Sequence, residues 1–487
     1  MTSAQIKARA RDLGFDLCGI APVGDFPELM HLPAWLADGR AGRMTYLNRT
    51  ARRRADVRQW LPSARSVVAV ACFYNTARPY STEIADPGVA LIARYAWGDD
   101  YHRVMTERLN VLLNWLRAAS FETFDACVSV DTGPVQERVY AQRAGIGWIG
   151  KNTCVINPDL GSWILLGELI TSLSLEPDAP ALDQCGTCTL CLDACPTHAI
   201  VEPHVLDARL CLSYLSIEIK GGIPADQRAD VGAHVFGCDI CQDVCPYNLR
   251  EPRVAGPEWA PRATLDQPRL ADLWSCSDGA LGEAIAGTAL VRRGVAGLRR
   301  NLAVALGNSS DAAAGRALAE PPSEVDAPSL CEPVVAEHLT WARNAARCRW
   351  PYSSVHDHAV CESSPPLVES NSRSSYAEPV KAPAPTLSPE GLRSALRAFC
   401  EKHPIRRLDV FGSAARGQAG PRSDVDLLVT LDDSVPVSTV EILEMAGEAE
   451  ELVGVPVDFV LLRALEQSPN GLAREHILAT AVQLYGR

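Results

Sequence analysis

Apolar positions along the first part of the chain alternate between helical and strand patterns. Residues 101–120 carry apolar side chains at helical spacing, and the largely apolar runs at 66–74 and 163–171 predict two buried strands. The N-terminal residues predict a short amphipathic helix that ends near Gly14 and leads into another strand. The pattern therefore predicts an α/β domain over residues 1–180.

Helical patterns alone follow residue 250. The Ala- and Leu-rich segments 297–308 and 334–347 each resemble the second helix of a two-helix solenoid repeat, which predicts a helical domain over residues 251–346. Residues 347–386 are rich in Ser and Pro and show no periodicity. This composition predicts a flexible linker to a further domain, and a long loop is the alternative.

Composition and charge narrow the class of protein. The net charge of -13 argues against indiscriminate nucleic-acid binding but leaves room for local basic sites. The sequence contains no apolar run approaching the roughly 20 residues that span a bilayer, and its N-terminus lacks the features of a secretory signal. We therefore expect a cytoplasmic monomer with no membrane contact. In that compartment, clustered thiols among the 17 cysteines bind metals or react rather than form disulfides.

Eight cysteines form two groups with the spacing of iron–sulfur ligands. Residues 185–196, "CGTCTLCLDACP", follow the C-x2-C-x2-C-x3-C-P run of bacterial ferredoxins, and "CDICQDVCP" at 238–246 repeats the end of that run. Cys211, between the groups, completes the second set. A zinc site normally uses two separate C-x2-C pairs, which fits this spacing less well. The pattern favours an electron-transfer chain that serves an acceptor of low potential.

The last cysteine of each run, before proline, usually ligates the other cluster. We therefore expect one [4Fe–4S] cluster on Cys185, Cys188, Cys191 and Cys245, and a second on Cys195, Cys211, Cys238 and Cys241.

Asp131 ends an apolar strand beside a Gly-Pro turn ahead of the clusters. Such an acid can donate a proton to a reacting group, and a turn-capping aspartate is the alternative. Two basic stretches are also present, seven arginines within 40–58 and two arginine pairs within 291–308, placed to share one helix face. Each is either solvated helix surface or a contact for nucleic acid.

Several segments together resemble one known family. "VDTGPVQER", "GWIGKNT", "GSWILLGE", "CGTCTLCLDACPTHAI", "CLSYLSIE" and "GCDICQDVCPYN" occur in the order and at the spacing found in epoxyqueuosine reductases, and "RYAWGDDYH" is also similar. The resemblance covers about residues 1–346. It implies a cobalamin-binding α/β domain at 1–180, a ferredoxin-like two-cluster module at 181–250 and HEAT-like helical repeats at 251–346.

The resemblance also implies the chemistry. Members of the family reduce the epoxide of epoxyqueuosine at the wobble position of tRNA, with cobalamin held without a protein histidine ligand and electrons from an external low-potential donor. Asp131 is implied as the acid that protonates the opening epoxide oxygen, and burial would have to raise its pKa. The positions that match cobalamin-lining residues are Arg54, Lys151, Asn152, Ser213 and Asp239. The candidates for tRNA phosphate contacts are Lys220, Arg292, Arg293, Arg299 and Arg300.

Residues 387–487 return to mixed patterns and predict a separate α/β domain. In "FGSAARGQAGPRSDVDLLV" two aspartates alternate along a strand and share one face, and a third acid follows on a second strand. Such carboxylates suit Mg²⁺ bound with nucleotide phosphates, and a Gly-Ser turn brings backbone amides to phosphate oxygens. The residues are Asp424, Asp426 and Asp458 for the metal and Gly412 and Ser413 for the nucleotide.

This second domain resembles the minimal nucleotidyltransferases. The resemblance implies that the three acids and the Gly-Ser pair are active-site positions, and that a separate helical protein partners the domain. An inert domain with an acidic turn is the alternative.

Two other functions compete with epoxide reduction. A reductive dehalogenase would share cobalamin and clusters, but the helical region and the absence of an export signal oppose it. An electron carrier without its own substrate would share only the clusters, and bound cobalamin would exclude it.

Overall fold

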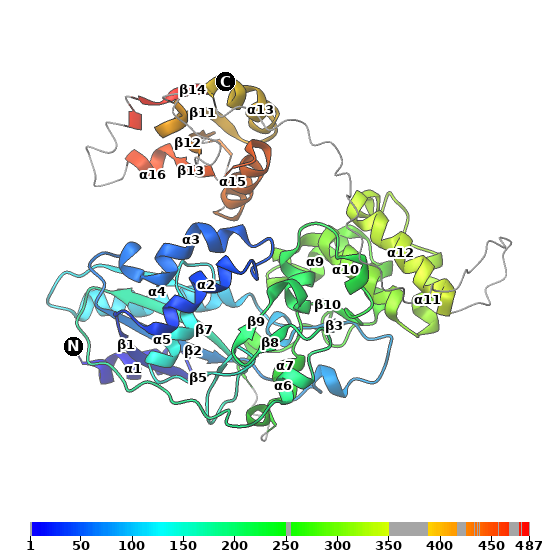
Figure 1. Cartoon of the computed structure of the whole chain (residues 1–487), viewed down its shortest axis with the longest axis horizontal. Coiled ribbons are helices and arrows are strands. Elements are labelled where there is room, and N and C mark those ends of the chain that lie inside the picture. Colours follow the sequence, from blue (N-terminus) through cyan, green and yellow to red (C-terminus); the bar gives the residue numbers. More distant parts are fainter. Residues whose placement is uncertain are drawn as a thin grey trace, which may run out of the picture. The chain divides into compact units, whose positions relative to one another are not determined.

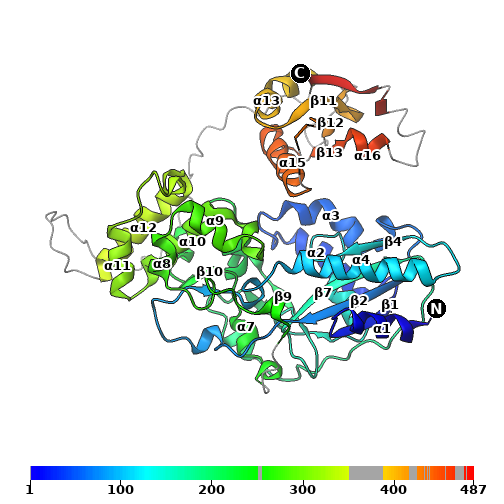
Figure 2. The same cartoon turned by 180° about the vertical axis from the view of Figure 1, so that it is seen from behind.

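The computed structural model describes residues 2–249, 255–349, 388–415, 425–432, 434–435, 437, 439–455, 457–466, 477–478 and 480–486. The chain divides into two compact units, Met1–Glu362 and Ser363–Arg487 (Figures 1 and 2). Most of the predicted linker, residues 350–386, lies outside the described residues. None of the described helices is long and apolar enough to cross a membrane.

A four-stranded sheet forms the centre of the first unit. Its strands lie in the order β1-β2-β7-β4, and every neighbouring pair is antiparallel. Every residue of β2 is buried, because this interior strand is covered on both faces, and its sequence is accordingly apolar from Val67 to Phe73. The strands predicted at 66–74 and 163–171 are confirmed. The bounds are β1 Leu17–Pro22, β2 Ser66–Phe73, β4 Ala126–Ser129 and β7 Ile164–Thr171.

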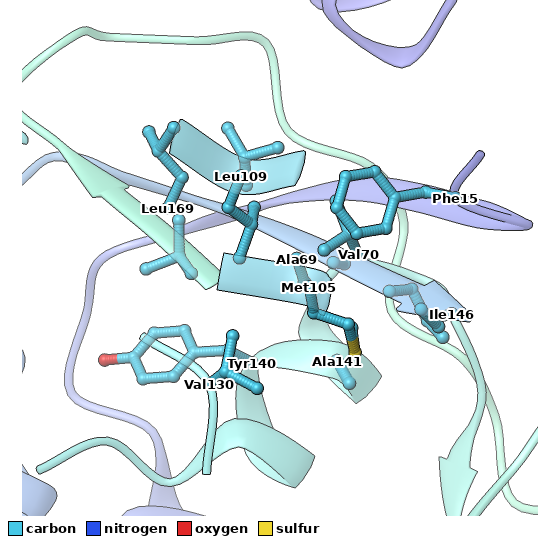
Figure 3. Close-up of a cluster of buried hydrophobic side chains, with 14 of the residues drawn as sticks. Phe15, Ala69, Val70, Met105, Leu109, Val130, Tyr140, Ala141, Ile146 and Leu169 are labelled. Atoms are coloured by element: carbon cyan, nitrogen blue, oxygen red, sulfur yellow. The ribbon is translucent and has the colours of Figure 1, made fainter. Parts of the chain in front are cut away.

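Helices cover both faces of this sheet. The predicted helices at the N-terminus and at 101–120 are confirmed as α1 Ser3–Asp12, which packs on β1, and α4 Tyr101–Ala119. A Cβ atom added to Gly167 of β7 would lie 3.1 Å from Leu109 of α4. Because neighbouring strand residues point to opposite faces, the next residue of β7 faces the side that α5 Glu137–Arg143 covers. Figure 3 shows side chains from α4, α5 and the strands in the core between them.

A second core lies among the helices that follow residue 265. The segments predicted as helical at 297–308 and 334–347 are the helices α10 and α12. A short strand from the first part of the chain, β3 Leu91–Ile92, pairs in parallel with β10 His234–Phe236, and Ile92 and Trp97 pack into this second core. The helices are α8 Leu270–Ser275, α9 Asp278–Ile285, α10 Gly294–Asn308, α11 Ala312–Ala319 and α12 Pro333–Arg349.

The cysteine-bearing region between the two cores is built from short elements. Each cysteine group contains one short helix, and one turn of π-helix, η6 Tyr214–Glu218, follows Cys211. The remaining elements are α2 His31–Ala37, α3 Thr45–Ala55, β5 Trp148–Ile149, β6 Val155–Ile156, α6 Leu190–Asp193, β8 Ile200–Glu202, β9 Val205–Leu206 and α7 Ile240–Asp243.

The second unit has its own sheet, in the order β13-β12-β11-β14. The parallel pair is β12 and β13, and β11 runs antiparallel to both of its neighbours. The strand patterns at 424–431 and 456–462 correspond to β12 and β13. The elements are α13 Pro389–Lys402, β11 Ile405–Phe411, α14 Gly412–Ala415, β12 Val425–Leu431, α15 Thr439–Val453, β13 Val457–Leu461, α16 Leu462–Glu466 and β14 Val482–Gly486.

Candidate active site

One cavity brings four cysteine side chains together. Its lining includes Cys185, Cys188, Cys191 and Cys245, with Ile156, Leu190, Pro246 and Tyr247 among the other residues. Burial raises the pKa of Cys191 to about 11, and the neighbouring thiols add to the rise. Burial likewise raises the pKa of Cys245 to about 11, with contributions from Cys185 and Cys191. The grouping is the one expected for the first cluster.

The other four cysteines also influence one another. Burial raises the pKa of Cys238, and nearby Cys211 and Cys195 are among the groups that add to the rise. The pKa of Cys241 is raised by contact with Cys154, by burial, and by Cys238 and Cys211. This is the grouping expected for the second cluster. Thiols with raised pKa values bind metal as thiolates, so loading these sites releases protons.

Hydrogen-bond donors point at two of the candidate ligand sulfurs. The indole Nε1 of Trp148 lies 3.4 Å from the Sγ of Cys185, and the backbone N–H of Ala199 donates to the Sγ of Cys195 at 3.3 Å. Such donors tune the potential of iron–sulfur clusters. Within the described residues, His, Cys, Asp and Glu side chains never come together in threes around a point that could hold one metal ion.

Lys151 and Asn152, which match cobalamin-lining positions, instead reach the cluster-bearing loops. The Nζ of Lys151 donates to the carbonyls of Gly186 at 2.7 Å and Cys188 at 2.9 Å. The Nδ2 of Asn152 donates to the carbonyl of Cys241 at 3.1 Å. These two neighbouring side chains therefore brace one loop of each cysteine group.

The backbone of Asp131 adopts the left-handed conformation, with φ of 58°. Its N–H donates to the carboxylate of Glu137, at the start of α5. Its own carboxylate is 42% exposed, and its Oδ2 lies 3.1 Å from the Nε2 of His102. The Nδ1 of His102 lies 2.7 Å from Asp100. An imidazole thus bridges two carboxylates, one of which faces solvent.

The direction of the Asp131 pKa shift contradicts the prediction of a raised value. Burial raises the pKa of Asp131, but the hydrogen bond and charge of His102, with the charge of Arg292, outweigh burial and leave the pKa below its ordinary value. Burial lowers the pKa of His102, but the hydrogen bonds and charges of Asp100 and Asp131 raise it to about 9. At neutral pH the proton therefore resides on His102, and Asp131 is its charged partner.

Arg292, a candidate for tRNA phosphates, lies beside Asp131. Its Nη1 is 3.4 Å from the Oδ2 of Asp131, and its Nη2 is 2.8 Å from Glu218. Glu218 is the last residue of the π-helix η6, and this helix follows Cys211. A single turn of π-helix often marks a functional site. Here it connects a candidate cluster ligand to the acid through one arginine.

Two of the predicted tRNA contacts are wrong. Arg299 and Arg300 are both 0% exposed. Arg299 donates to the carbonyls of Trp274 and Cys276. Arg300 donates to the carbonyls of Leu215, Ile219 and Gly221 at 2.6–2.7 Å. A guanidinium surrounded by carbonyls inside the protein cannot reach a phosphate, so these arginines are structural.

The other tRNA candidates lie nearer the surface. Lys220 is exposed, and its carbonyl lies 3.5 Å from an Nη atom of the half-buried Arg293. The three remaining cobalamin candidates make contacts in different parts of the chain. Arg54 donates to the carbonyl of Val135 in the Asp131 turn at 2.8 Å. Asp239 is buried and accepts the N–H of Arg94 at 2.6 Å, and Ser213 precedes η6.

The second unit places some of its candidate residues together. Asp426 and Asp458 are register partners on the neighbouring strands β12 and β13. Asp426 is also paired in register with Phe411, directly before Gly412 and Ser413 at the start of α14. Asp424 lies outside the described residues, and the side chain of Asp458 is not described.

Three acid–base residues near Asp131 escaped the sequence prediction. His102 lies in the segment "RYAWGDDYH", and Glu137 lies in "VDTGPVQER", so both belong to segments already singled out. Glu168 is the one charged residue in the apolar run of β7. A carboxylate in an otherwise buried strand is the signal that could have found it.

Clustered thiols and an acid–base pair in one unit are features of an iron–sulfur oxidoreductase, and a second domain is joined to it. Family models agree: "4Fe-4S double cluster binding domain" matches residues 184–248, "Epoxyqueuosine reductase QueG, DUF1730" matches 54–132, and "Nucleotidyltransferase domain" matches 392–479. The epoxyqueuosine reductase of Gloeobacter violaceus is 45% identical over 64% of this chain and 98% of its own length. That of Escherichia coli is 35% identical over 69% of this chain and 88% of its own.

Solved structures agree with the sequence comparisons. An epoxyqueuosine reductase crystallised with an epoxyqueuosine-modified tRNA-Tyr stem loop matches with a TM-score of 0.61 and 31% identity, over 70% of this chain and 89% of that one. A Bacillus subtilis epoxyqueuosine reductase, with its catalytic aspartate loop swung out of the active site, matches with a TM-score of 0.62 and 31% identity over the same shares. The chain belongs to the epoxyqueuosine reductase family and carries an additional C-terminal nucleotidyltransferase domain. The resemblance seen in the sequence is confirmed.

Proposed function

We propose that the first unit reduces epoxyqueuosine in tRNA to queuosine, using cobalamin and two [4Fe–4S] clusters. The observation that carries the proposal is the connection between Cys211 and the acid–base pair, through η6, Glu218 and Arg292. It joins an electron-delivering centre to a proton donor, and epoxide reduction to an alkene and water consumes both electrons and protons. Family membership supplies the substrate.

The residues around Asp131 fit a cobalamin held without a histidine ligand. Both ring nitrogens of His102 are engaged by carboxylates, so this imidazole is not free to ligate cobalt. Arg54 and Ser213, which flank the Asp131 turn and η6, are the candidates that would hold the cofactor at this place. Lys151, Asn152 and Asp239 would contact the cofactor from the side where the cluster ligands lie. When bound, reduced cobalamin supplies a low-potential electron source for the epoxide carbon.

Reduction of an epoxide to an alkene and water consumes two protons; solvent supplies the second, and the protein supplies the first. His102 holds it at Nε2, next to the Oδ2 of Asp131. As the epoxide oxygen gains negative charge, His102 releases its proton to Asp131, and Asp131 passes that proton on to the oxygen. Asp100 accepts from Nδ1 and keeps Nε2 directed at Asp131. Arg292 neutralises the carboxylate that remains, and the exposed Lys220 is a candidate contact for tRNA phosphates.

The direct test is the reaction itself. Anaerobically prepared enzyme, reconstituted with iron, sulfide and cobalamin and reduced by a low-potential donor, should convert epoxyqueuosine in tRNA to queuosine. Nucleoside analysis by mass spectrometry measures the conversion. Absence of queuosine from fully loaded enzyme would contradict the proposed function, and conversion without cobalamin would contradict the proposed cofactor.

The proposed proton source predicts a fall in activity at alkaline pH. Because the pKa of His102 is raised to about 9, its proton is present below that pH and is lost as the pH rises through it. The ion pair between His102 and Asp131 also stabilises the fold. This contribution is complete below about pH 6.5, the pKa of a histidine in the unfolded chain, and is lost as the pH rises through about 9. Single-turnover rates from pH 6 to 10 should therefore fall near pH 9 in the wild type. The variant His102→Gln should be slow and lack this limb, whereas His31→Gln, at an exposed histidine, should keep the wild-type profile.

We propose that the second unit is a nucleotidyltransferase that holds Mg²⁺ with Asp424, Asp426 and Asp458. The register pairing of Asp426 with Asp458 supports a shared site. The resemblance to minimal nucleotidyltransferases favours a helical partner protein for this unit, and HEAT-like packing is proposed for α8–α12 of the first.

The two activities should be separable. Because the chain forms two compact units, a protein ending at Arg349 should reduce epoxyqueuosine at close to the full rate. The double variant Asp424→Ala/Asp426→Ala should lose nucleotide transfer to a partner protein and keep the reductase. Reductase turnover and transfer of labelled nucleotide measure the two separately. A shortened protein that folds and loads its clusters but cannot reduce the substrate would show that the units depend on each other.

A further inference from the structure

The buried carboxyl group of Glu168 lies close enough to Asp131 and Glu137 to be influenced by the charges of both. Glu168 of β7 is 0% exposed, and neither of its carboxylate oxygens receives a hydrogen bond from the described residues. An ionised carboxylate without partners is costly inside a protein, so such a group takes up a proton instead. The mechanism proposed above makes no use of Glu168.

Its nearest ionisable neighbour is Glu137, which contacts Asp131. Burial, followed by the charge of Glu137, raises the pKa of Glu168 well above its ordinary value. Burial, followed by the charge of Asp131, raises the pKa of Glu137 to about 7. The other charged groups facing Glu137 are Arg138 and Arg54, and both lower its pKa. Two facing carboxyl groups form a hydrogen bond only when one of them is protonated.

The surroundings decide which of the two carries the proton. Glu137 accepts the N–H of Asp131 and lies near two arginines, and each of these favours its charged form. The groups that influence the pKa of Glu168 are the acids Glu137 and Asp131 and include no cation. The Oγ of Ser129, the register partner of Glu168 on β4, is likewise buried without a partner among the described residues. A hydrogen bond between the two groups would therefore run from an acid O–H on Glu168 to the carboxylate of Glu137.

We propose that Glu168 carries a proton shared with Glu137, and that this acid pair positions the turn that presents Asp131. The left-handed backbone of Asp131 is a conformation that residues other than glycine adopt sparingly, so it must be held by its surroundings. Glu137 holds it through the backbone N–H, and Glu168 holds Glu137. Glu137 therefore acts as a positioning residue. The role of this acid pair depends on the proposed function only because Asp131 is taken as the acid.

Infrared spectroscopy tests the proton directly. At pH 7 the loaded wild-type enzyme should show the carbonyl stretch of a protonated carboxylic acid, which shifts on deuteration. The band should lose intensity in Glu168→Gln, whose amide still donates to Glu137, and should be unchanged in Glu122→Gln, at an exposed glutamate. An undiminished band in Glu168→Gln would overturn the proposal.

If Glu168→Gln fails to fold, the variant Glu137→Gln tests the same pairing of the two carboxyl groups. A neutral residue at 137 removes the adjacent negative charge that raises the pKa of Glu168, so the band should disappear at a lower pH than in the wild type. A band that disappears at the wild-type pH would overturn the pairing.

Kinetics test the positioning role. Glu137→Ala removes the acceptor of the Asp131 N–H and should lower kcat on the order of 10²-fold, as misplacement of a reacting group does. KM for tRNA and the iron content should not change. Glu137→Gln retains an acceptor oxygen and should recover most of kcat, whereas equal losses in the two variants would overturn the role. If the wild type fails to reduce epoxyqueuosine, the proposed function fails, but the infrared band still tests the acid pair.

Discussion

The Cys211→Ala protein should bind about four irons instead of the about eight expected for two [4Fe–4S] clusters. Cys211 is the one proposed ligand outside the two cysteine runs, and the thiols that affect its pKa include Cys195 of the second set. Losing one of four ligands should leave that site unable to hold a stable cluster. The first set, around the cavity lined by Cys185, Cys188 and Cys191, does not include Cys211 and should load normally.

Activity should fall with the cluster. Electrons must pass through both centres one at a time, so the Cys211→Ala protein should have no measurable turnover. Iron and sulfide analysis, with electron paramagnetic resonance of the reduced protein, separates the two clusters. Cys154→Ala is the matched control, because this thiol lies beside Cys241 but is not a proposed ligand. A full iron content in Cys211→Ala, together with a lower iron content in Cys154→Ala, would show that Cys154 and not Cys211 is the ligand.

The elements of the fold were predictable where the pattern of apolar positions was strong. The continuous run of β2 and the periodic spacing of α4 follow directly from burial on both faces and on one face, respectively. The pairing of β3 with β10 was not predictable, because β3 is only two residues long and its partner lies far along the chain. Short strands carry too little pattern to show which core they join.

The same contrast applies to the site. Cysteine spacing is a local property, so the two ligand sets could be written from the sequence. The pKa and the burial of a charged side chain depend on neighbours from distant segments, so the sequence predicted these properties wrongly. Asp131 was expected to be an acid with a raised pKa, but His102 and Arg292, from two other elements, lower its pKa. Arg299 and Arg300 were expected on the surface, and only the packing of α10 shows them to be buried.

Replacing Asp131 with asparagine should slow epoxide reduction by about 10²–10⁴-fold, the usual contribution of a general acid. Asparagine has nearly the same shape and is among the residues that best tolerate a left-handed backbone, so the turn should keep its conformation. Its amide cannot take a proton from His102 and pass it to the epoxide oxygen. Cobalamin and both clusters should bind normally.

Single-turnover assays with pre-reduced enzyme separate this chemical step from the supply of electrons. The matched control is Asp99→Asn, because Asp99 pairs with Arg103 and Arg262 and not with His102. It should react at close to the wild-type rate. The loss of the Asp131 carboxylate should also lower the pKa of His102, which NMR titration can measure, because that carboxylate is one of the groups that raise it. A wild-type rate in Asp131→Asn would remove Asp131 from proton transfer and leave His102 as the donor, whereas loss of cobalamin from this variant would assign Asp131 to binding the cofactor.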